Sequence, residues 1–444
     1  MGDASPAPSP SYERTQFGKE MLKHFSFDPN WKNLNHGSFG TFPRAVRNKQ
    51  REYQDLCESA PDPFIRYTYP NLSDAAREGV AKILNCSPEA VVFVPNATTG
   101  VNTVLRNIVW NEDGKDEILY FSQIYGACLK TIEYVYETHH NSVNPREIVP
   151  EYPLEDADYV NLFKDAIKAS RATGKRPRLA IYDAVSSLPG VRIPFEDLTA
   201  VCKSEGILSL IDAAHGIGHI PLDMLTLDPD FLVTNAHKWL FVPRGCAVFY
   251  VPLKNQPLMR SSLPTSHGFV PKTVGAYTMP LPPVTKSEFT NQFEFIGTID
   301  TTNYLVAGEA IKWREEVCGG EKAIMDYNIK LAQEGGKLVA EILGTKVLDN
   351  ESHSLTNCCL VNVLLSIAVG AEDVTGMVTI KEEDVVMTGE WLQHSLVDDH
   401  KTFLAIWLFQ GQLWARLSGQ IYLDITDFHW AGETLKALCE RVGK

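Results

Sequence analysis

Two short apolar runs, each followed by a chemically distinctive side chain, constrain this chain of 444 residues more than any other feature. Ile207 to Ile211 leads into Asp212, and Phe231 to Thr234 is followed by Lys238. Apolar runs of this length between turn residues predict buried strands. The carboxylate and the amine are therefore expected at the ends of two strands.

A lysine and a carboxylate at strand ends are the pair that pyridoxal phosphate (PLP) requires. The amine forms a Schiff base with the cofactor aldehyde, and the carboxylate keeps the pyridine nitrogen protonated, so that the ring can accept electrons. Trp239 and Leu240 flank Lys238 with apolar surface, which predicts a desolvated amine with a lowered pKa. The small residues of Ala213 to Gly218 would let a flat ring approach the backbone. The alternative is that Asp212 and Lys238 are ordinary surface residues.

The rest of the chain alternates between strand-like and helix-like segments. Further strands are expected at Val91–Pro95, Glu117–Phe121, Glu147–Val149, Arg178–Val185 and Gly245–Pro252. Helices are expected between them, at about Tyr125–Glu137, Asp156–Thr173 and Pro194–Glu205. Alternation at this spacing predicts an α/β fold with a mainly parallel sheet, of the seven-stranded type, covered by helices on both faces.

The predicted organisation has three parts. Residues 1–15 are expected to form a disordered tail, residues 16–290 a large cofactor-binding α/β domain with an N-terminal arm, and residues 291–444 a smaller α+β domain. Within these parts, Pro61 to Pro70 is predicted to be irregular, and Leu263 to Ile299, rich in Pro, Gly, Ser and Thr, is predicted to be a long loop.

Composition excludes several classes of protein. A net charge of −14 disfavours nucleic acid as a partner. No apolar run reaches the roughly 18 residues of a membrane span, and the N-terminus lacks a basic region followed by an apolar one, so a cytoplasmic location is expected. The nine cysteines are odd in number and contain no CxxC, which indicates neither a disulfide framework nor a metal site.

The turn from Asn96 to Asn102 is the best phosphate candidate, because helix N-terminal amides and the hydroxyls of Thr98 and Thr99 suit a dianion. Simple N-capping is the alternative. Asn235 and His237 flank Lys238 and are predicted to contact phosphate as well, with His237 pointing away from Lys238 along the strand. A satisfied core histidine is the competing interpretation.

Other candidates lie near the same edge of the sheet. Tyr125 follows a strand and could stack on the cofactor ring, protonate a leaving group or simply pack. His215 could support the cofactor or act on the substrate. His36 and Asn35 share a loop and are candidate substrate contacts, although both histidines could instead be structural.

Arg416 lies on a predicted strand of the small domain. A buried arginine is a bidentate clamp for a carboxylate and would suit an amino-acid substrate, with an interdomain ion pair as the alternative. Thr298, in the stretch Phe293 to Asp300, could reach a phosphate in the second subunit of a homodimer. Cys358 and Cys359 are predicted core residues, which disfavours persulfide transfer.

Several of these motifs carry a family resemblance. They include DAAHGIGHI, TNAHKWLFVPRGCAVFYV, NLNHGSFGT, FVPNATTGVNTVLRNIVW, IYGAC, FEFIGTID and WARLSGQIYL. Together they resemble the class V enzymes of PLP fold type I, in the isopenicillin N epimerase-like group. Within it the similarity is greatest to fungal hercynylcysteine sulfoxide lyases of ergothioneine biosynthesis. The similar stretches extend from about Phe17 to Val442.

The resemblance implies roles for the residues that match its motifs. Lys238 would carry the cofactor and Asp212 would bind the pyridine nitrogen. Thr98, His237 and the partner's Thr298 would bind phosphate, with Arg416 on the substrate carboxylate and Tyr125 as the acid. The implied reaction is carbon–sulfur β-elimination, in which Lys238 removes the α-proton and the products are a thiol or sulfenate, pyruvate and ammonia.

Two other functions remain open at this point. Lyases, cyclases, epimerases or aminotransferases of fungal specialised metabolism, including loline-type cyclisation and cleavage of hydroxylated amino acids, share these cofactor residues. Upstream of WARLS, this chain has AIWLFQGQ, where the sulfoxide lyases are expected to have a more basic or His-containing stretch. A catalytically inactive scaffold homologue is the third possibility, and the presence of Lys238 and Asp212 argues against it.

Overall fold

The structure is a computed structural model that describes residues 11–139, 142–272, 286–370 and 376–443. Most of the predicted disordered tail, residues 1–10, lies outside the described residues. Its remainder is anchored, because the backbone amide of Tyr12 donates to Glu316 at 2.8 Å and its hydroxyl donates to Glu309. No helix in the described part of the chain is both long and apolar enough to cross a membrane.

A seven-stranded sheet forms the centre of the larger unit. Its strands are β1 (Val91–Val94), β2 (Asp116–Phe121), β3 (Val143–Ile148), β4 (Arg176–Asp183), β5 (Leu208–Asp212), β6 (Phe231–Thr234) and β7 (Ala247–Tyr250). They lie in the order β1-β7-β6-β5-β4-β2-β3. Only β7 runs antiparallel to its neighbours β1 and β6, and the other pairs are parallel. The predicted α/β fold with a mainly parallel sheet is confirmed.

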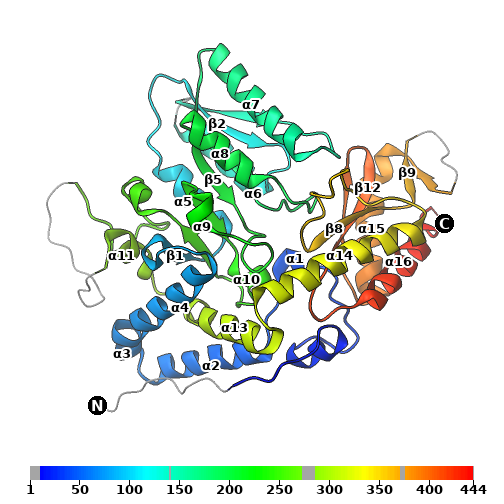
Figure 1. The fold of residues 1–444 in the computed structure, drawn as a ribbon, viewed down its shortest axis with the longest axis horizontal. Helices are drawn as coiled ribbons and strands as arrows, with labels where there is room; N and C mark the ends of the chain where they lie inside the picture. Colours follow the sequence, from blue (N-terminus) through cyan, green and yellow to red (C-terminus); the bar gives the residue numbers. More distant parts are fainter. Residues whose placement is uncertain (1–10, 140–141, 273–285, 371–375, 444) are drawn as a thin grey trace.

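Helices cover both faces of this sheet (Figure 1). Helices α5 (Ala97–Asn107) and α6 (Gly126–Thr138) pack on one face, where Val101 and Cys128 share a buried cluster with Val233. Helices α7 (Asp156–Ala172) and α8 (Phe195–Glu205) pack on the other face, with residues such as Phe163 and Leu232. Because strand side chains alternate between two covered faces, nearly every position of the strands other than the edge strand β3 is buried, and this explains their continuous apolar runs.

The smaller unit contains a three-stranded antiparallel sheet. Its strands are β11 (Ala405–Phe409), β12 (Gln412–Ser418) and β8 (Leu360–Leu364). The covering helices are α14 (Glu321–Leu343), α15 (Val385–Asp398) and α16 (Ile425–Cys439), and a short parallel pair, β9 (Ile367–Val369) and β10 (Val378–Ile380), lies beside them. Met21 and Phe25 of the N-terminal arm join the core of this unit, so this arm packs against the C-terminal half of the chain.

One predicted irregular region is helical, and the predicted long loop contains a short helix. Pro61–Pro70 lies within a continuous helical stretch formed by α3 (Pro61–Pro63), the π-helical turn η2 (Phe64–Thr68) and α4 (Tyr69–Ile83), which follows α2 (Arg44–Ser59). Pro61 and Pro63 fall in the first turn of this stretch, where the missing N–H costs nothing, and Pro70 is the second residue of α4, directly after the π-helical turn. The predicted long loop contains α11 (Glu288–Glu294), capped by Ser287, and residues 273–285 of that loop lie outside the described residues.

Three further helices lead from this loop into the smaller unit. They are α12 (Thr302–Leu305), α13 (Ala307–Trp313) and the π-helical turn η5 (Arg314–Cys318). In Figure 1, the short helix α10 (Ala236–Trp239) lies near the centre of the molecule, next to α1 (His36–Phe39) and between the two sheets. The candidate active site is built around α10.

Candidate active site

Lys238 lies on α10 and not on a strand, which corrects the expectation that His237 and Lys238 alternate along β6. Two glycines with positive φ press against this helix. A Cβ on Gly40 (φ +64) would lie 2.0 Å from the carbonyl oxygen of His237, and one on Gly218 (φ +78) would lie 2.6 Å from that of Trp239. Only residues without a Cβ fit there, so α10 is held closely by backbone on two sides.

Two buried carboxylates lie side by side at the end of the large sheet. Asp212 ends β5, Asp183 ends β4, and the two are paired in register. Asp212 accepts hydrogen bonds from the amide of Ala214 (3.0 Å) and the thiol of Cys128 (3.3 Å). Burial raises the pKa of both carboxyls, and their electrostatic interaction with Lys238 opposes this. Asp183 was missed from the sequence, because its strand was expected to continue to Val185.

The amine of Lys238 is in the environment that the sequence predicted. Its Nζ lies 2.9 Å from Nε2 of His215. Burial, followed by the positive charge of Arg416, lowers the pKa of Lys238 from 10.5 to about 8, although Asp212 and Asp183 act in the opposite direction. About a tenth of this amine is therefore an unprotonated nucleophile and base at pH 7, and about half of it at pH 8.

His36 is next to Lys238 but is fully engaged with the protein. Its Nε2–H donates to the carbonyl oxygen of Lys238 at 2.6 Å, and Nδ1 accepts from the hydroxyl of Tyr422 at 3.0 Å. Both ring nitrogens are used, so the predicted substrate contact of His36 is not supported. His36 instead holds the backbone of α10, which is the structural alternative considered for it.

The first turn of α5 is capped by its own neighbours. Asn96 accepts from the amide of Thr99 (2.8 Å) and from its hydroxyl (3.0 Å), and Asn235 accepts from the amide of Ala97 (2.9 Å). The Thr99 hydroxyl and the Asn235 oxygen, both predicted to contact phosphate, are thus used within the chain. The Thr98 hydroxyl makes no hydrogen bond among the described residues and is the side chain left for an anion at this helix N-terminus.

His237 donates its Nδ1–H to the carbonyl of Cys246 at 2.9 Å, which leaves Nε2 as its second polar atom. Burial lowers the pKa of His237 to about 4, so Nε2 is an acceptor in the free chain. A phosphate dianion needs a donor, and its negative charge would raise the pKa of this ring. The predicted phosphate contact of His237 therefore requires protonation on binding.

Arg416 on β12 is buried and points at the same region. Its guanidinium donates to the carbonyl of Ser187 (2.6 Å), to Asn35 Oδ1 (3.0 Å) and to the hydroxyl of Ser38 (2.9 Å), while Nε has no partner. No carboxylate of the described residues forms an ion pair with Arg416. The alternative interpretation of Arg416, an interdomain ion pair, is therefore wrong. Burial lowers the pKa of Arg416 to about 10. Asn35 orients this arginine.

Two predicted residues make no side-chain hydrogen bond with this cluster of described residues. Tyr125 precedes α6 at its N-cap position and is 51% exposed. Thr298 is exposed in the wall of a groove of about 690 Å³, whose lining includes Phe64, Tyr69 and the loop from Phe293 to Thr302. None of the residues around Lys238 lines this groove. Any contact of Thr298 with a cofactor phosphate would have to occur in another subunit.

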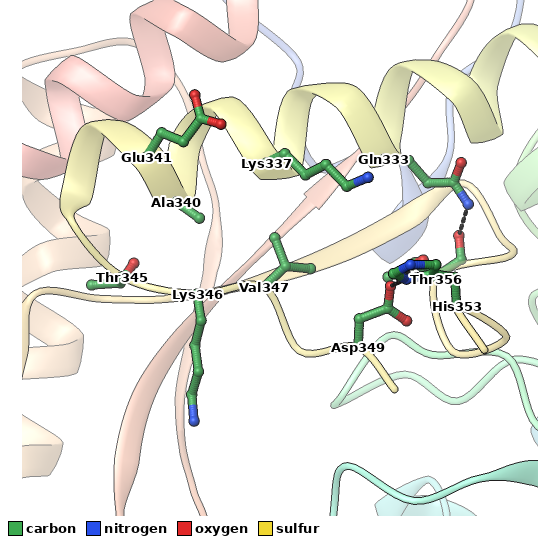
Figure 2. Close-up of a pocket in the computed structure, with 10 residues that line it drawn as sticks. All are labelled: Gln333, Lys337, Ala340, Glu341, Thr345, Lys346, Val347, Asp349, His353 and Thr356. Atoms are coloured by element: carbon green, nitrogen blue, oxygen red, sulfur yellow. Dashed lines mark hydrogen bonds and ion pairs between the residues drawn. The ribbon is translucent and has the colours of Figure 1, made fainter. Parts of the chain in front are cut away.

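A second cavity, of about 380 Å³, lies between α14 and the loop that follows it (Figure 2). Gln333 donates to the carbonyl of Thr356 at 3.1 Å, and His353 pairs with Asp349 at 2.6 Å. Its lining includes neither Lys238 nor Arg416, so it is separate from the site.

The nine cysteines are all free, and seven of them, including Cys358 and Cys359, are buried.

A buried lysine, a strand-end carboxylate and a helix N-terminus at the edge of a mainly parallel sheet define an enzyme of PLP fold type I. The Aminotransferase class-V family model matches residues 66–387, more than half of the chain. The chain belongs to this family and is a PLP-dependent lyase of it. Pyridoxal 5'-phosphate is its cofactor.

Similar proteins span nearly the whole chain. The L-cysteine desulfhydrase-like protein lolT1 of Epichloe uncinata is 38% identical, over 97% of this chain and 97% of its own. The hercynylcysteine sulfoxide lyase of Schizosaccharomyces pombe is 32% identical, over 96% of this chain and 99% of its own. The solved structure of the cystine C-S lyase C-DES with cysteine persulfide has a TM-score of 0.68 at 18% identity, covering 92% of this chain and 98% of that one, and it supports the fold.

Proposed function

We propose that this enzyme is a carbon–sulfur lyase that cleaves an S-substituted cysteine by β-elimination. The candidate substrate is a hercynylcysteine sulfoxide-like conjugate, with a thiol or sulfenate, pyruvate and ammonia as products. The observation that best supports this proposal is the environment of Arg416. Its guanidinium is buried, has no carboxylate partner among the described residues, and lies close enough to Lys238 to lower the pKa of the lysine. A substrate α-carboxylate would supply the missing anion.

The donor set of the site fits PLP. Lys238 offers a buried amine of lowered pKa, Asp212 a strand-end carboxylate, and α5 an N-terminus with the free hydroxyl of Thr98. When bound, PLP supplies an electron sink for the bond broken at the α-carbon. Asp212 would hold a proton on the ring nitrogen, and His237 would donate to phosphate once protonated.

The side chains of the site would then divide the reaction among them. Arg416 would orient the substrate through its carboxylate, and Asn35 and Ser38 would keep the guanidinium plane fixed. Lys238, released as a neutral amine, would take the α-proton. Tyr125, at the exposed start of α6, would deliver a proton to the departing sulfur group. A homodimer in which Thr298 reaches the neighbouring site is part of this proposal.

A second candidate is supported by the relative that is 38% identical, lolT1, which bears the name L-cysteine desulfhydrase-like. On this alternative the enzyme serves fungal specialised metabolism, as a lyase, cyclase, epimerase or aminotransferase. The cofactor residues proposed above would be shared by both candidates. What would differ is the group bonded to the β-carbon of the substrate.

The test is to incubate the purified enzyme with PLP and either L-cysteine or a bulky cysteine sulfoxide, and to measure pyruvate and the sulfur product. Elimination from the sulfoxide at a kcat/KM well above that for L-cysteine supports the proposal. Pyruvate from neither compound contradicts it, and elimination from L-cysteine alone favours the second candidate. Lys238→Ala is the control, and it should form no Schiff base between the protein and PLP and release no pyruvate.

A further inference from the structure

Trp239, His215 and Lys238 form a chain of hydrogen bonds inside the site. The indole Nε1–H of Trp239 donates to Nδ1 of His215 at 3.1 Å, and Nε2 of His215 lies 2.9 Å from Nζ of Lys238. Trp239 and Lys238 are consecutive on α10, whereas His215 comes from the turn after β5. His215 is almost completely buried, at 2% exposure.

The chemistry of these atoms fixes the position of one proton. An indole nitrogen can only donate, so Nδ1 of His215 must accept. Burial, followed by the charges of Lys238 and Arg416, lowers the pKa of His215 well below its usual value, and the ring is neutral. Its single proton is therefore on Nε2, which donates toward Lys238. The Nζ atom can accept it only through the lone pair of an uncharged amine.

We propose that Trp239 is a positioning residue that fixes the tautomer of His215 and thereby favours the unprotonated amine of Lys238. If Lys238 were an ammonium group in the same place, its N–H and the Nε2–H of His215 would both be donors and would repel each other. Without the indole donor, the ring proton could move to Nδ1, and Nε2 would then accept from an ammonium. The inference deepens the proposed function, since Lys238 is the reacting amine there.

Packing holds the indole in the orientation that this role needs. The ring of Trp239 stacks on His219, with centroids 4.1 Å apart and planes inclined by 29°. His219 is itself fixed, because its Nε2 accepts the backbone N–H of Cys359 at 2.7 Å. The other charged groups that act on Lys238 are Arg416, Asp212 and Asp183. The charged side chain that bonds to Trp239 is Arg314, which donates to its backbone carbonyl at 2.8 Å and leaves the indole N–H to His215.

The test compares the wild type with Trp239→Phe and Trp313→Phe, as full-length chains freed of cofactor. Phenylalanine keeps an aromatic ring for stacking but removes the N–H. Trp313 is the matched control, because it is fully buried and its Nε1 bonds to no acceptor among the described residues. ¹⁵N NMR of labelled histidines reports the tautomer, and His215→Gln identifies the signal. The pH dependence of Schiff-base formation with PLP reports the pKa of Lys238.

In the wild type, His215 should carry its proton on Nε2, and the rate of Schiff-base formation should rise with a midpoint near pH 8. Trp239→Phe should move the proton to Nδ1 and raise that midpoint by about one pH unit, the scale of one hydrogen bond. Trp313→Phe should change neither.

If His215 of the wild type carries its proton on Nδ1, the proposal is wrong. This measurement needs no variant, so the proposal can be refuted even if Trp239→Phe does not fold. An unchanged midpoint in folded Trp239→Phe overturns it as well. Neither measurement uses a substrate, so both remain interpretable if the proposed elimination fails.

Discussion

Replacement of Lys238 by methionine should change how the stability of this enzyme depends on pH. Burial lowers the pKa of the amine from 10.5 to about 8, and the cost of charging it in the folded chain is therefore about 3 kcal/mol. Between these two pH values the unfolded chain binds more protons than the folded one, so the wild type gains stability as the pH rises. Lys238→Met has no such group.

The difference in unfolding free energy between the wild type and Lys238→Met should thus shift in favour of the wild type by up to about 3 kcal/mol from pH 8 to 10.5. Urea unfolding of both cofactor-free proteins at pH 7 and pH 10 would measure most of this change. Lys130→Met is the control, because the exposed Lys130 pairs with Glu133 at 2.7 Å, which raises its pKa and gives the opposite trend. An equal difference at both pH values for Lys238→Met would refute the argument that burial sets this pKa.

Two other substitutions test the geometry of the site. Gly40→Ala would place a Cβ 2.0 Å from the carbonyl oxygen of His237, and it should lower both the melting temperature and the affinity for PLP. Gly174→Ala is the control, because Gly174 has a similar φ of +73 but no atom within 4 Å of the added Cβ. It should lose only about 1 kcal/mol of stability through backbone strain. Arg416→Lys keeps the charge but loses the planar donor pair, so KM for an amino-acid substrate should rise by roughly 10-fold to 100-fold. An unchanged KM would mean that Arg416 does not bind the carboxylate.

Much of the fold could be predicted from local sequence. The apolar runs that end at Asp212 and Thr234 became β5 and β6, because fully buried parallel strands have no polar face to interrupt the pattern. The stretch from Pro61 to Pro70 was mispredicted, because proline is a poor guide to helix ends when it occupies the first turn. The β11 strand was missed, although its sequence AIWLF is an apolar run followed by a turn.

The residues of the candidate site could also be predicted only in part. The identities of Lys238, Asp212 and Arg416 could be selected from the sequence, since each is an ionisable residue beside an apolar run. The hydrogen bonds of His36 and Trp239 could not, because their partners, Tyr422 and His215, come from other parts of the chain.

The sequence by itself determined the strands of the large sheet, which amine and acid follow them, and hence the class of chemistry, because apolar runs and side-chain type are local properties. Only the tertiary structure decided that Asp183 lies beside Asp212, that Arg416 has no carboxylate partner among the described residues, and which nitrogen of His215 carries its proton. Those facts depend on distances between segments far apart in the chain, and hydrogen-bond roles are settled only when both partners are in place.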